Sequence, residues 1–202
     1  MSNPVSRVTK GEERRADILG VARRVLLEGG YHKLSLRQVA ASLDISIGNL
    51  QYYFPSKDDL VETVISQEID VALNIALGAA PDRADQSASV HAVVQAILQH
   101  HASEAGRYYA IAAGLALHQP RFARLKSRGY ALVLEQVAVM IEDQKPYLDA
   151  HRRKALATVV VALIDGASLQ VQFGETKAAA DAVDVLSAHI AEAIVHLMTH
   201  WE

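Results

Sequence analysis

The chain has 202 residues, of which 50% are hydrophobic and 21% charged, a composition that supports one large or two modest folded domains rather than a disordered chain. The absence of cysteine excludes disulfides, thiolate metal sites and a cysteine nucleophile. The net charge is −3, yet the first 60 residues carry nine Lys or Arg against seven Asp or Glu, and the remainder carries eleven against sixteen. This asymmetry is a mild indication of a nucleic-acid-binding end and a second end with a different role.

The N-terminal stretch MSNPVSRVTKGEERR lacks the apolar run of a secretion signal. No uninterrupted apolar stretch reaches the length needed to span a membrane. We therefore expect a cytoplasmic protein without a membrane partner.

The first predicted helix begins at a capping box. Thr9 and Glu12 have the required spacing, in which each side chain accepts a hydrogen bond from the other residue's backbone amide. Apolar residues then recur every three or four positions, as on the buried face of a helix. Gly29-Gly30 is expected to end the helix, because glycine adopts the left-handed terminal conformation without steric cost.

Two short helices joined by a tight turn follow. Ser35 is expected to cap a helix that ends near Leu43, and Ser46 to cap a second helix over 47–53. The apolar residues suitably spaced to pack between them are Val39, Ala40, Leu43, Ile45 and Leu50. Two helices meeting at such a turn form a helix-turn-helix, whose second helix enters the DNA major groove with its N-terminal residues at the base edges.

The rest of the chain also has helical periodicity. Ser56 is expected to cap a helix over 57–77, and 78–89 is the best candidate for a loop. Further helices are predicted at 89–102, 104–118, 121–143, 149–173 and 178–200. The sequence therefore predicts an all-α fold of about nine helices. We expect an N-terminal three-helix helix-turn-helix domain over 1–56 and a helical bundle for ligand binding and dimerisation over 57–202.

The run from about Arg14 to Leu60 resembles the N-terminal domain of TetR-family transcriptional regulators. The matching residues are Gly29-Gly30-Tyr31, Ser35, Val39-Ala40, Ser46, Gly48-Asn49-Leu50, Tyr52-Tyr53-Phe54 and Lys57. Gln51 stands where that family commonly has tyrosine, and Tyr53 where it commonly has histidine. From these departures we expect a changed base preference with DNA binding retained.

The resemblance implies two groups of residues that contact double-stranded operator DNA. Ser35, Tyr52, Tyr53 and Lys57 would hold phosphates, whereas Arg37, Ser46, Asn49 and Gln51 would face bases or nearby backbone, with Gly48 leaving room for close approach. Taken singly, each residue also has an ordinary explanation. Exposed amides are common on helices, the tyrosines could pack in a core, and a lysine can be merely solvated.

The resemblance also implies a homodimer formed by the last two helices. Their apolar positions are Val159, Leu163, Gly166, Leu169 and Phe173, followed by Val183, Leu186, Ile190, Ile194, Leu197 and Trp201. The same faces could instead pack inside one subunit. A small-molecule effector would bind between the DNA-binding domain and this interface, with candidate lining residues Tyr108, Leu115, His118, Phe122, Met140, Gln170 and Phe173.

The leading hypothesis is thus a repressor that binds an operator as a homodimer and is released by a small molecule. The alternatives are a DNA-binding dimer without an inducer and a helical enzyme whose N-terminal unit is structural. Against the enzyme stands the lack of a nucleophile–base constellation or cofactor motif, although Asp165 lies in an apolar helix. We expect no cofactor and no metal site, since only His196 and His200 have ligand spacing on one helical face and no cysteine assists them.

Overall fold

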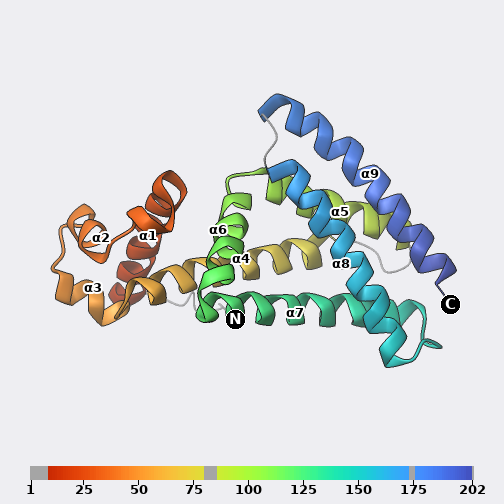
Figure 1. Cartoon of the computed structure of the whole chain (residues 1–202), viewed down its shortest axis with the longest axis horizontal. Helices are drawn as coiled ribbons and strands as arrows, with labels where there is room; N and C mark the ends of the chain where they lie inside the picture. The colour runs from red at the N-terminus through yellow and green to blue at the C-terminus, as the bar shows by residue number, and fades with distance from the viewer. Residues whose placement is uncertain (1–8, 80–85, 173–175, 202) are drawn as a thin grey trace, which may run out of the picture. The chain divides into compact units, whose positions relative to one another are not determined.

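The computed structural model describes residues 9–79, 86–172 and 176–201, with the backbone alone for 86 and 176–182 (Figure 1). Within these ranges the chain forms nine α-helices and no strand. Their bounds are α1 Lys10–Lys33, α2 Leu36–Ser42, α3 Ile47–Tyr53, α4 Lys57–Ala79, α5 Gln86–Ala102, α6 Gly106–His118, α7 Pro120–Gln144, α8 Ala150–Gln172 and α9 Thr176–His200. The all-α prediction is confirmed. The predicted 78–89 loop is shorter than expected, because α4 extends two residues into it and α5 begins three residues before its predicted end.

The backbone contacts divide the chain into two compact units, the first ending at Ile65 and the second beginning at Ser66. Helix α4 therefore contributes residues to both units, whereas the sequence placed the domain boundary before this helix. Each unit has its own buried apolar residues.

The N-terminal caps form as the sequence predicted. The Oγ1 atom of Thr9 accepts from the Glu12 N–H at 3.2 Å, and the Glu12 carboxylate accepts from the Thr9 N–H at 2.8 Å. Ser56 and Asp59 make the same reciprocal pair at the start of α4, at 3.1 and 2.9 Å. These side chains satisfy backbone donors that have no partner within the helix, so they fix where α1 and α4 begin.

The predicted end of α1 at Gly29-Gly30 needs a correction. Gly30 does break the helix, with φ 67° and ψ −177°, but helical structure resumes after this kink and continues to Lys33. The ψ value also differs from that of the left-handed terminal conformation that was expected. Glycine is still the residue best suited to this position, because other side chains rarely adopt a positive φ.

The core of the first unit joins α1, α2 and α3. Ile18, Leu26, Val39 and Leu50 are fully buried, and Phe54 is 2% exposed where α3 ends. Val39, Ala40 and Leu50 confirm the predicted packing between the two short helices, while Leu43 and Ile45 are half-buried. Burying side chains of this size removes enough apolar surface from water to hold two seven-residue helices that would not be stable alone.

In the second unit, α9 packs on α5 and α8, and α7 packs on α6 and α8. The core includes Leu98, Ile141 and Leu156, together with Val183 and Ile194 of α9. These two α9 residues were predicted to face a second subunit, and burial inside their own unit corrects that assignment. The other α9 positions named for the interface, Leu186, Ile190, Leu197 and Trp201, are partly buried against the same core.

Helix α8 is the one described helix that is long and apolar enough to cross a membrane by length and composition alone. Val160, Val161 and Val171 on this helix are buried within the unit. Its apolar character therefore has an explanation in core packing, since a core helix passes the same test.

Candidate nucleic-acid interface

Helix α3 is anchored through one side and presents the other side to solvent. Leu50 is its buried residue, while Ile47, Gly48, Asn49, Gln51 and Tyr52 are all exposed. The turn before it is closed by the Ile45 N–H, which donates to the Ala40 carbonyl at 3.1 Å, and by Asp44 at φ 52°. Asp tolerates this left-handed conformation better than most residues. A seven-residue helix is thus held with most of its surface free for a partner.

The residues expected to contact DNA lie together on the first unit. Ser35, Arg37, Ser46, Gly48, Asn49, Gln51 and Tyr52 are exposed, and Tyr53 and Lys57 are half-buried. Asn49 and Gln51 both lie on the solvent side of α3, where their amides can make the paired hydrogen bonds that adenine accepts and donates in the major groove. Their roles toward bases remain a prediction.

Ser35 and Ser46 each serve as a helix cap. Their hydroxyl oxygens accept from the Gln38 and Asn49 N–H groups at 3.2 and 3.1 Å. A serine hydroxyl that accepts in this way still has its own hydrogen to donate. The phosphate contact expected of Ser35 is therefore compatible with its structural role.

The adjacent tyrosines at the end of α3 differ in exposure. Tyr52 is 82% exposed, whereas Tyr53 is half-buried and meets the Tyr52 ring edge-on at a centroid separation of 5.2 Å. The hydroxyl of Tyr53 lies beside the first turn of α1, 3.9 Å from where a Cβ on Gly11 would stand. Tyr52 is accordingly the freer of the two to reach a phosphate.

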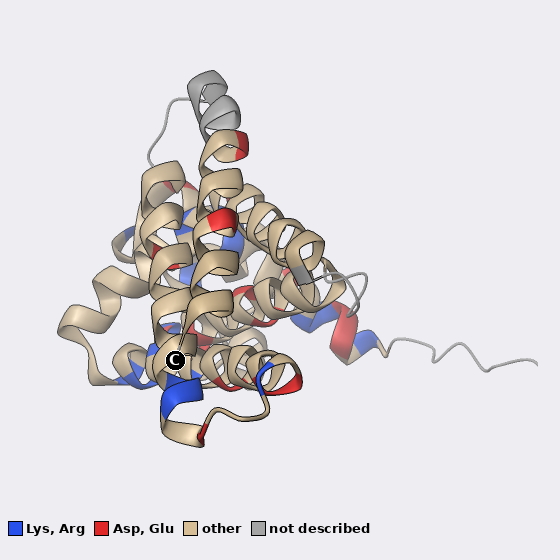
Figure 2. Ribbon diagram, turned by 90° about the vertical axis from the view of Figure 1, so that its right-hand side faces the viewer, with Lys and Arg blue, Asp and Glu red and all other residues tan. Residues whose placement is uncertain are grey.

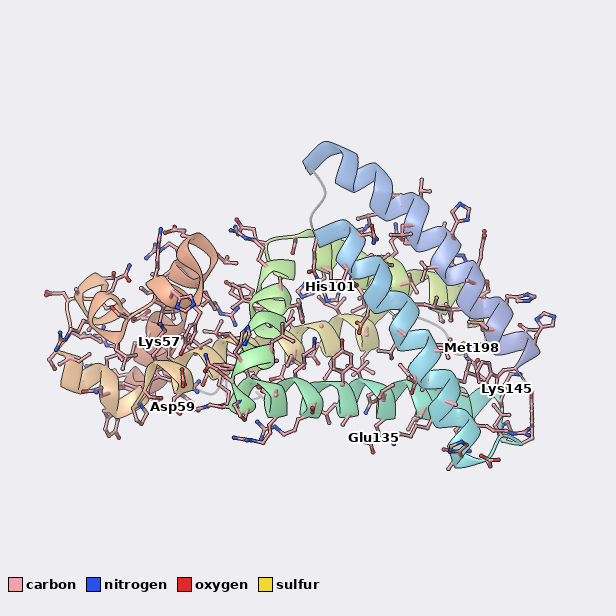
Figure 3. All side chains as sticks on the ribbon, in the orientation of Figure 1. Lys57, Asp59, His101, Glu135, Lys145 and Met198 are labelled. Atoms are coloured by element: carbon pink, nitrogen blue, oxygen red, sulfur yellow. The ribbon has the colours of Figure 1, made fainter. Side chains whose placement is uncertain are left out.

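Lys57, which Figure 3 labels, is supported by an aromatic ring that sequence reasoning did not assign to it. Its Nζ lies 3.9 Å from the centroid of Tyr31, whose hydroxyl donates to Asp58 at 2.5 Å. Partial burial lowers the pKa of Lys57. The Gly-Gly-aromatic motif marked Tyr31 as important, but only the fold shows that its ring stands under the ammonium group of Lys57.

Arg15 is a second residue that sequence reasoning did not include in the interface. Its guanidinium lies 5.1 Å from the centroid of Phe54, beside the C-terminal end of α3, and the residue is exposed. A basic residue held next to α3 is well placed for a phosphate. The concentration of basic residues near the N-terminus was the available signal, but it did not indicate which of them lies near α3.

The candidate effector residues have very different environments. Tyr108 and Phe122 are buried, Leu115 is half-buried, and His118, Met140 and Gln170 are exposed. Phe173 lies outside the described residues. The role of these residues toward an effector stays a prediction.

The described part of the chain contains no group of three or more His, Asp or Glu residues arranged to hold a metal ion. His196 and His200 instead stack on the surface of α9 with ring centroids 4.1 Å apart.

Comparison with known proteins finds similarity to bacterial transcriptional regulators. Residues 18–64 match the family model described as bacterial regulatory proteins, tetR family. The chain is 35% identical over 65 residues to the HTH-type transcriptional regulator UidR of Escherichia coli K12, and 36% identical over 58 residues to the HTH-type transcriptional repressor KstR of Mycolicibacterium smegmatis. These alignments cover 32% and 29% of this chain, and they span only 33% and 28% of the two regulators.

Two further similarities extend over the second unit. An uncharacterised HTH-type transcriptional regulator in the dhlA 5' region of Xanthobacter autotrophicus is 30% identical over 161 residues, covering 75% of this chain and 76% of the relative. The solved structure of Salmonella enterica GusR superposes with a TM-score of 0.76 at 19% identity, covering 95% of this chain and 98% of GusR. The first similarity concerns sequence over most of the chain, and the second concerns the fold.

Proposed function

Because the chain belongs to the TetR family of DNA-binding transcriptional regulators, we propose that it is a repressor that binds operator DNA as a homodimer and is released by a small molecule. The observation that carries the proposal is the exposed face of α3 on a fully buried anchor, Leu50. The relatives that match this chain are regulators, including the repressor KstR, and we propose no catalytic activity. We place its action in the cytoplasm, where operator DNA is found.

Two groups of residues would share DNA recognition, one that positions α3 on the duplex and one that contacts the bases. Ser35, Tyr52, Tyr53 and Lys57 would hold phosphates and set the register of α3, while Arg37, Ser46, Asn49 and Gln51 would face the bases or the adjacent backbone. Gly48 is exposed at the start of α3, where the absence of a side chain lets the backbone approach DNA closely.

Dimerisation is supported by an exposed apolar strip on α8. Ala162, Gly166 and Leu169 follow one another at steps of three and four residues, and Leu169 is 57% exposed. Helices α8 and α9 pack together and carry few charged residues over most of their length (Figure 2). Val185 of α9 is 60% exposed and would join the contact from the side opposite the core residues Val183 and Ile194. Small residues on α8 would let helices of two subunits approach closely.

Release by a small molecule requires that the molecule binds two conformations of the dimer with different affinities. Helix α4 suits the role of connection between the two sites, since it is one continuous helix whose first residues belong to the DNA-binding unit and whose last residues belong to the second unit. A bundle that binds no small molecule would favour the DNA-binding dimer without an inducer.

The proposal is tested by sedimentation velocity of the purified full-length protein, alone and on a duplex selected by the protein from a random library. We expect a dimer in solution and two protomers, or a multiple of two, on a duplex with inverted half-sites about one helical turn apart or a multiple of that. A monomer on a single half-site would contradict the homodimer, and failure to enrich any duplex would contradict sequence-specific binding.

A further inference from the structure

A cluster of buried polar side chains occupies the second unit where α5 ends, α6 begins and α8 ends. Its centre is formed by His101, which Figure 3 labels, and Ser168, which are 9% and 2% exposed. Gln172 lies one turn after Ser168 on the same face of α8. None of them was among the residues predicted to contact an effector. Polar groups are costly to bury, so each one needs a hydrogen-bond partner or a reason to lack one.

The hydrogen bonds of the cluster favour the tautomer of His101 that carries the ring hydrogen on Nε2. Its Nδ1 lies 2.6 Å from the Ser168 Oγ. If Nδ1 were the donor, both the buried serine hydrogen and the lone pair at Nε2 would lack a partner within the described residues. With the serine donating to Nδ1, only the Nε2–H remains, so this arrangement leaves fewer buried groups unsatisfied.

The neighbouring side chains do not satisfy that hydrogen. The Tyr109 hydroxyl donates to the Glu68 carbonyl at 2.8 Å and accepts from the Nε2–H of His100 at 3.3 Å. The Tyr109 ring meets His101 edge-on at a centroid separation of 4.5 Å. These contacts hold the His101 ring in place without offering an acceptor to its Nε2.

Two buried atoms therefore lack hydrogen-bond partners among the described residues, the Nε2 of His101 and the Oε1 of Gln172. The main chain of His101 and the side chain of Gln172 both pack against Gly106. A Cβ at that position would lie 1.9 Å from the His101 carbonyl oxygen and 3.0 Å from the Gln172 Cγ, so only glycine allows this approach. The His101 ring is bonded to Ser168, one turn before Gln172 on the same face of α8, so the unpartnered ring nitrogen and the unpartnered amide oxygen belong to one cluster of side chains.

The two unpartnered atoms determine which functional groups can bind to both of them. A hydroxyl group or a primary amide can accept from the Nε2–H and at the same time donate to the Oε1. A carboxylate has no hydrogen to donate to Gln172, and an ammonium group has no lone pair to accept from His101. Burial lowers the pKa of His101 to about 4, so the ring is uncharged at neutral pH and does not attract an anion.

We propose that His101 and Gln172 form the polar end of the effector site and that the effector is an uncharged molecule carrying a hydroxyl or primary amide group. That this molecule acts as the effector rests on the proposed function, whereas its binding to His101 and Gln172 does not depend on DNA. Gly106 and Ser168 are positioning residues, since Gly106 admits the His101 main chain and the Gln172 side chain, and Ser168 holds the His101 ring through Nδ1.

The test uses the full-length protein labelled with 15N at histidine and four probes on each of two skeletons. The probes are benzyl alcohol, benzamide, benzoate and benzylamine, with hexanol, hexanamide, hexanoate and hexylamine. We expect the alcohol or the amide of at least one skeleton to bind and to shift the Nε2 resonance of His101, with the matching carboxylate and amine at least tenfold weaker. Gln172→Leu, which removes the acceptor, should weaken that binding about tenfold, and Gln136→Leu on the exposed face of α7 should not.

Equal binding of the charged probes, no binding by any of the eight, or an unchanged affinity in Gln172→Leu would overturn the proposal. So would a crystal structure in which a single water bridges the two atoms and no probe displaces it. Operator binding by the same protein, measured without probes, tests the proposed function separately, because either measurement can fail without affecting the other.

Discussion

Substitution of Gly106 by alanine should destabilise the second unit strongly, although both residues are small. The added Cβ would lie 1.9 Å from the carbonyl oxygen of His101, a backbone atom that cannot rotate away. Gly114 on the same helix provides the matched control, because a Cβ there meets nothing within 4 Å and the residue is exposed. Both substitutions add one methyl group, in a crowded environment at Gly106 and in an open one at Gly114.

The magnitudes follow from these contacts. A carbon–oxygen contact normally requires about 3.3 Å, so the backbone at Gly106→Ala must move by about 1.4 Å. Forcing an extra carbon into a packed interior costs roughly 1–3 kcal/mol, and an immovable backbone neighbour places this case at about 3 kcal/mol. Gly114→Ala should instead stabilise the helix by about 1 kcal/mol through its higher helix propensity. The expected difference between the variants is about 4 kcal/mol.

Thermal unfolding followed by tryptophan fluorescence measures this difference. Trp201 is the single tryptophan of the chain and packs against the core of the second unit, so its emission reports on that unit. For a chain of this size, Gly114→Ala should raise Tm by roughly 2–4 °C and Gly106→Ala should lower it by roughly 6–12 °C. Equal Tm values for the two variants would refute the close approach of the His101 main chain and the Gln172 side chain to Gly106.

Three further predictions concern the DNA-binding unit and pH. Lys57→Ala should weaken binding to all sequences and reduce the salt slope of log K by roughly one per protomer, and an unchanged slope in a salt-titrated anisotropy assay would remove Lys57 from the phosphate contacts. Ser46→Ala should cost about 1 kcal/mol of capping energy and speed amide exchange at Leu50 roughly fivefold, whereas Ser46→Thr should not. Finally, His101 binds a proton less readily when folded, with a pKa of about 4 against 6.5, so its contribution to stability is complete above pH 6.5 and is lost as pH falls toward 4, by at most about 3 kcal/mol. His101→Gln should flatten that part of the stability–pH curve, and an equally steep curve would contradict the burial of a neutral ring.

The features that were predictable from sequence are those determined by near neighbours along the chain. Ser35, Ser46 and Ser56 cap helices because their hydroxyls reach a backbone amide three residues later, which spacing alone reveals. Leu50, unlike the exposed Ile47 of the same helix, has the spacing from Val39 and Ala40 that lets it pack between the two short helices. The two helices of the helix-turn-helix and their boundaries therefore follow from local sequence.

The features that were not predictable depend on which elements meet in space. The apolar stripe of α9 could serve a dimer or the subunit's own core, and burial assigns Val183 and Ile194 of that stripe to the core. His101 stands in the sequence as one of two adjacent histidines near a helix end, and only the approach of α8 gives it Ser168 as a partner.

The central claim is that the exposed face of α3 reads the sequence of operator DNA. The most direct measurement is selection of duplexes from a random library by the wild-type protein and by Gln51→Ala in parallel, with sequencing of both pools. We predict that the wild-type protein enriches an inverted repeat and that the variant enriches the same spacing with altered bases at one symmetric pair of positions. An identical consensus for the two proteins would contradict base recognition by Gln51, and the absence of any consensus would contradict the claim itself.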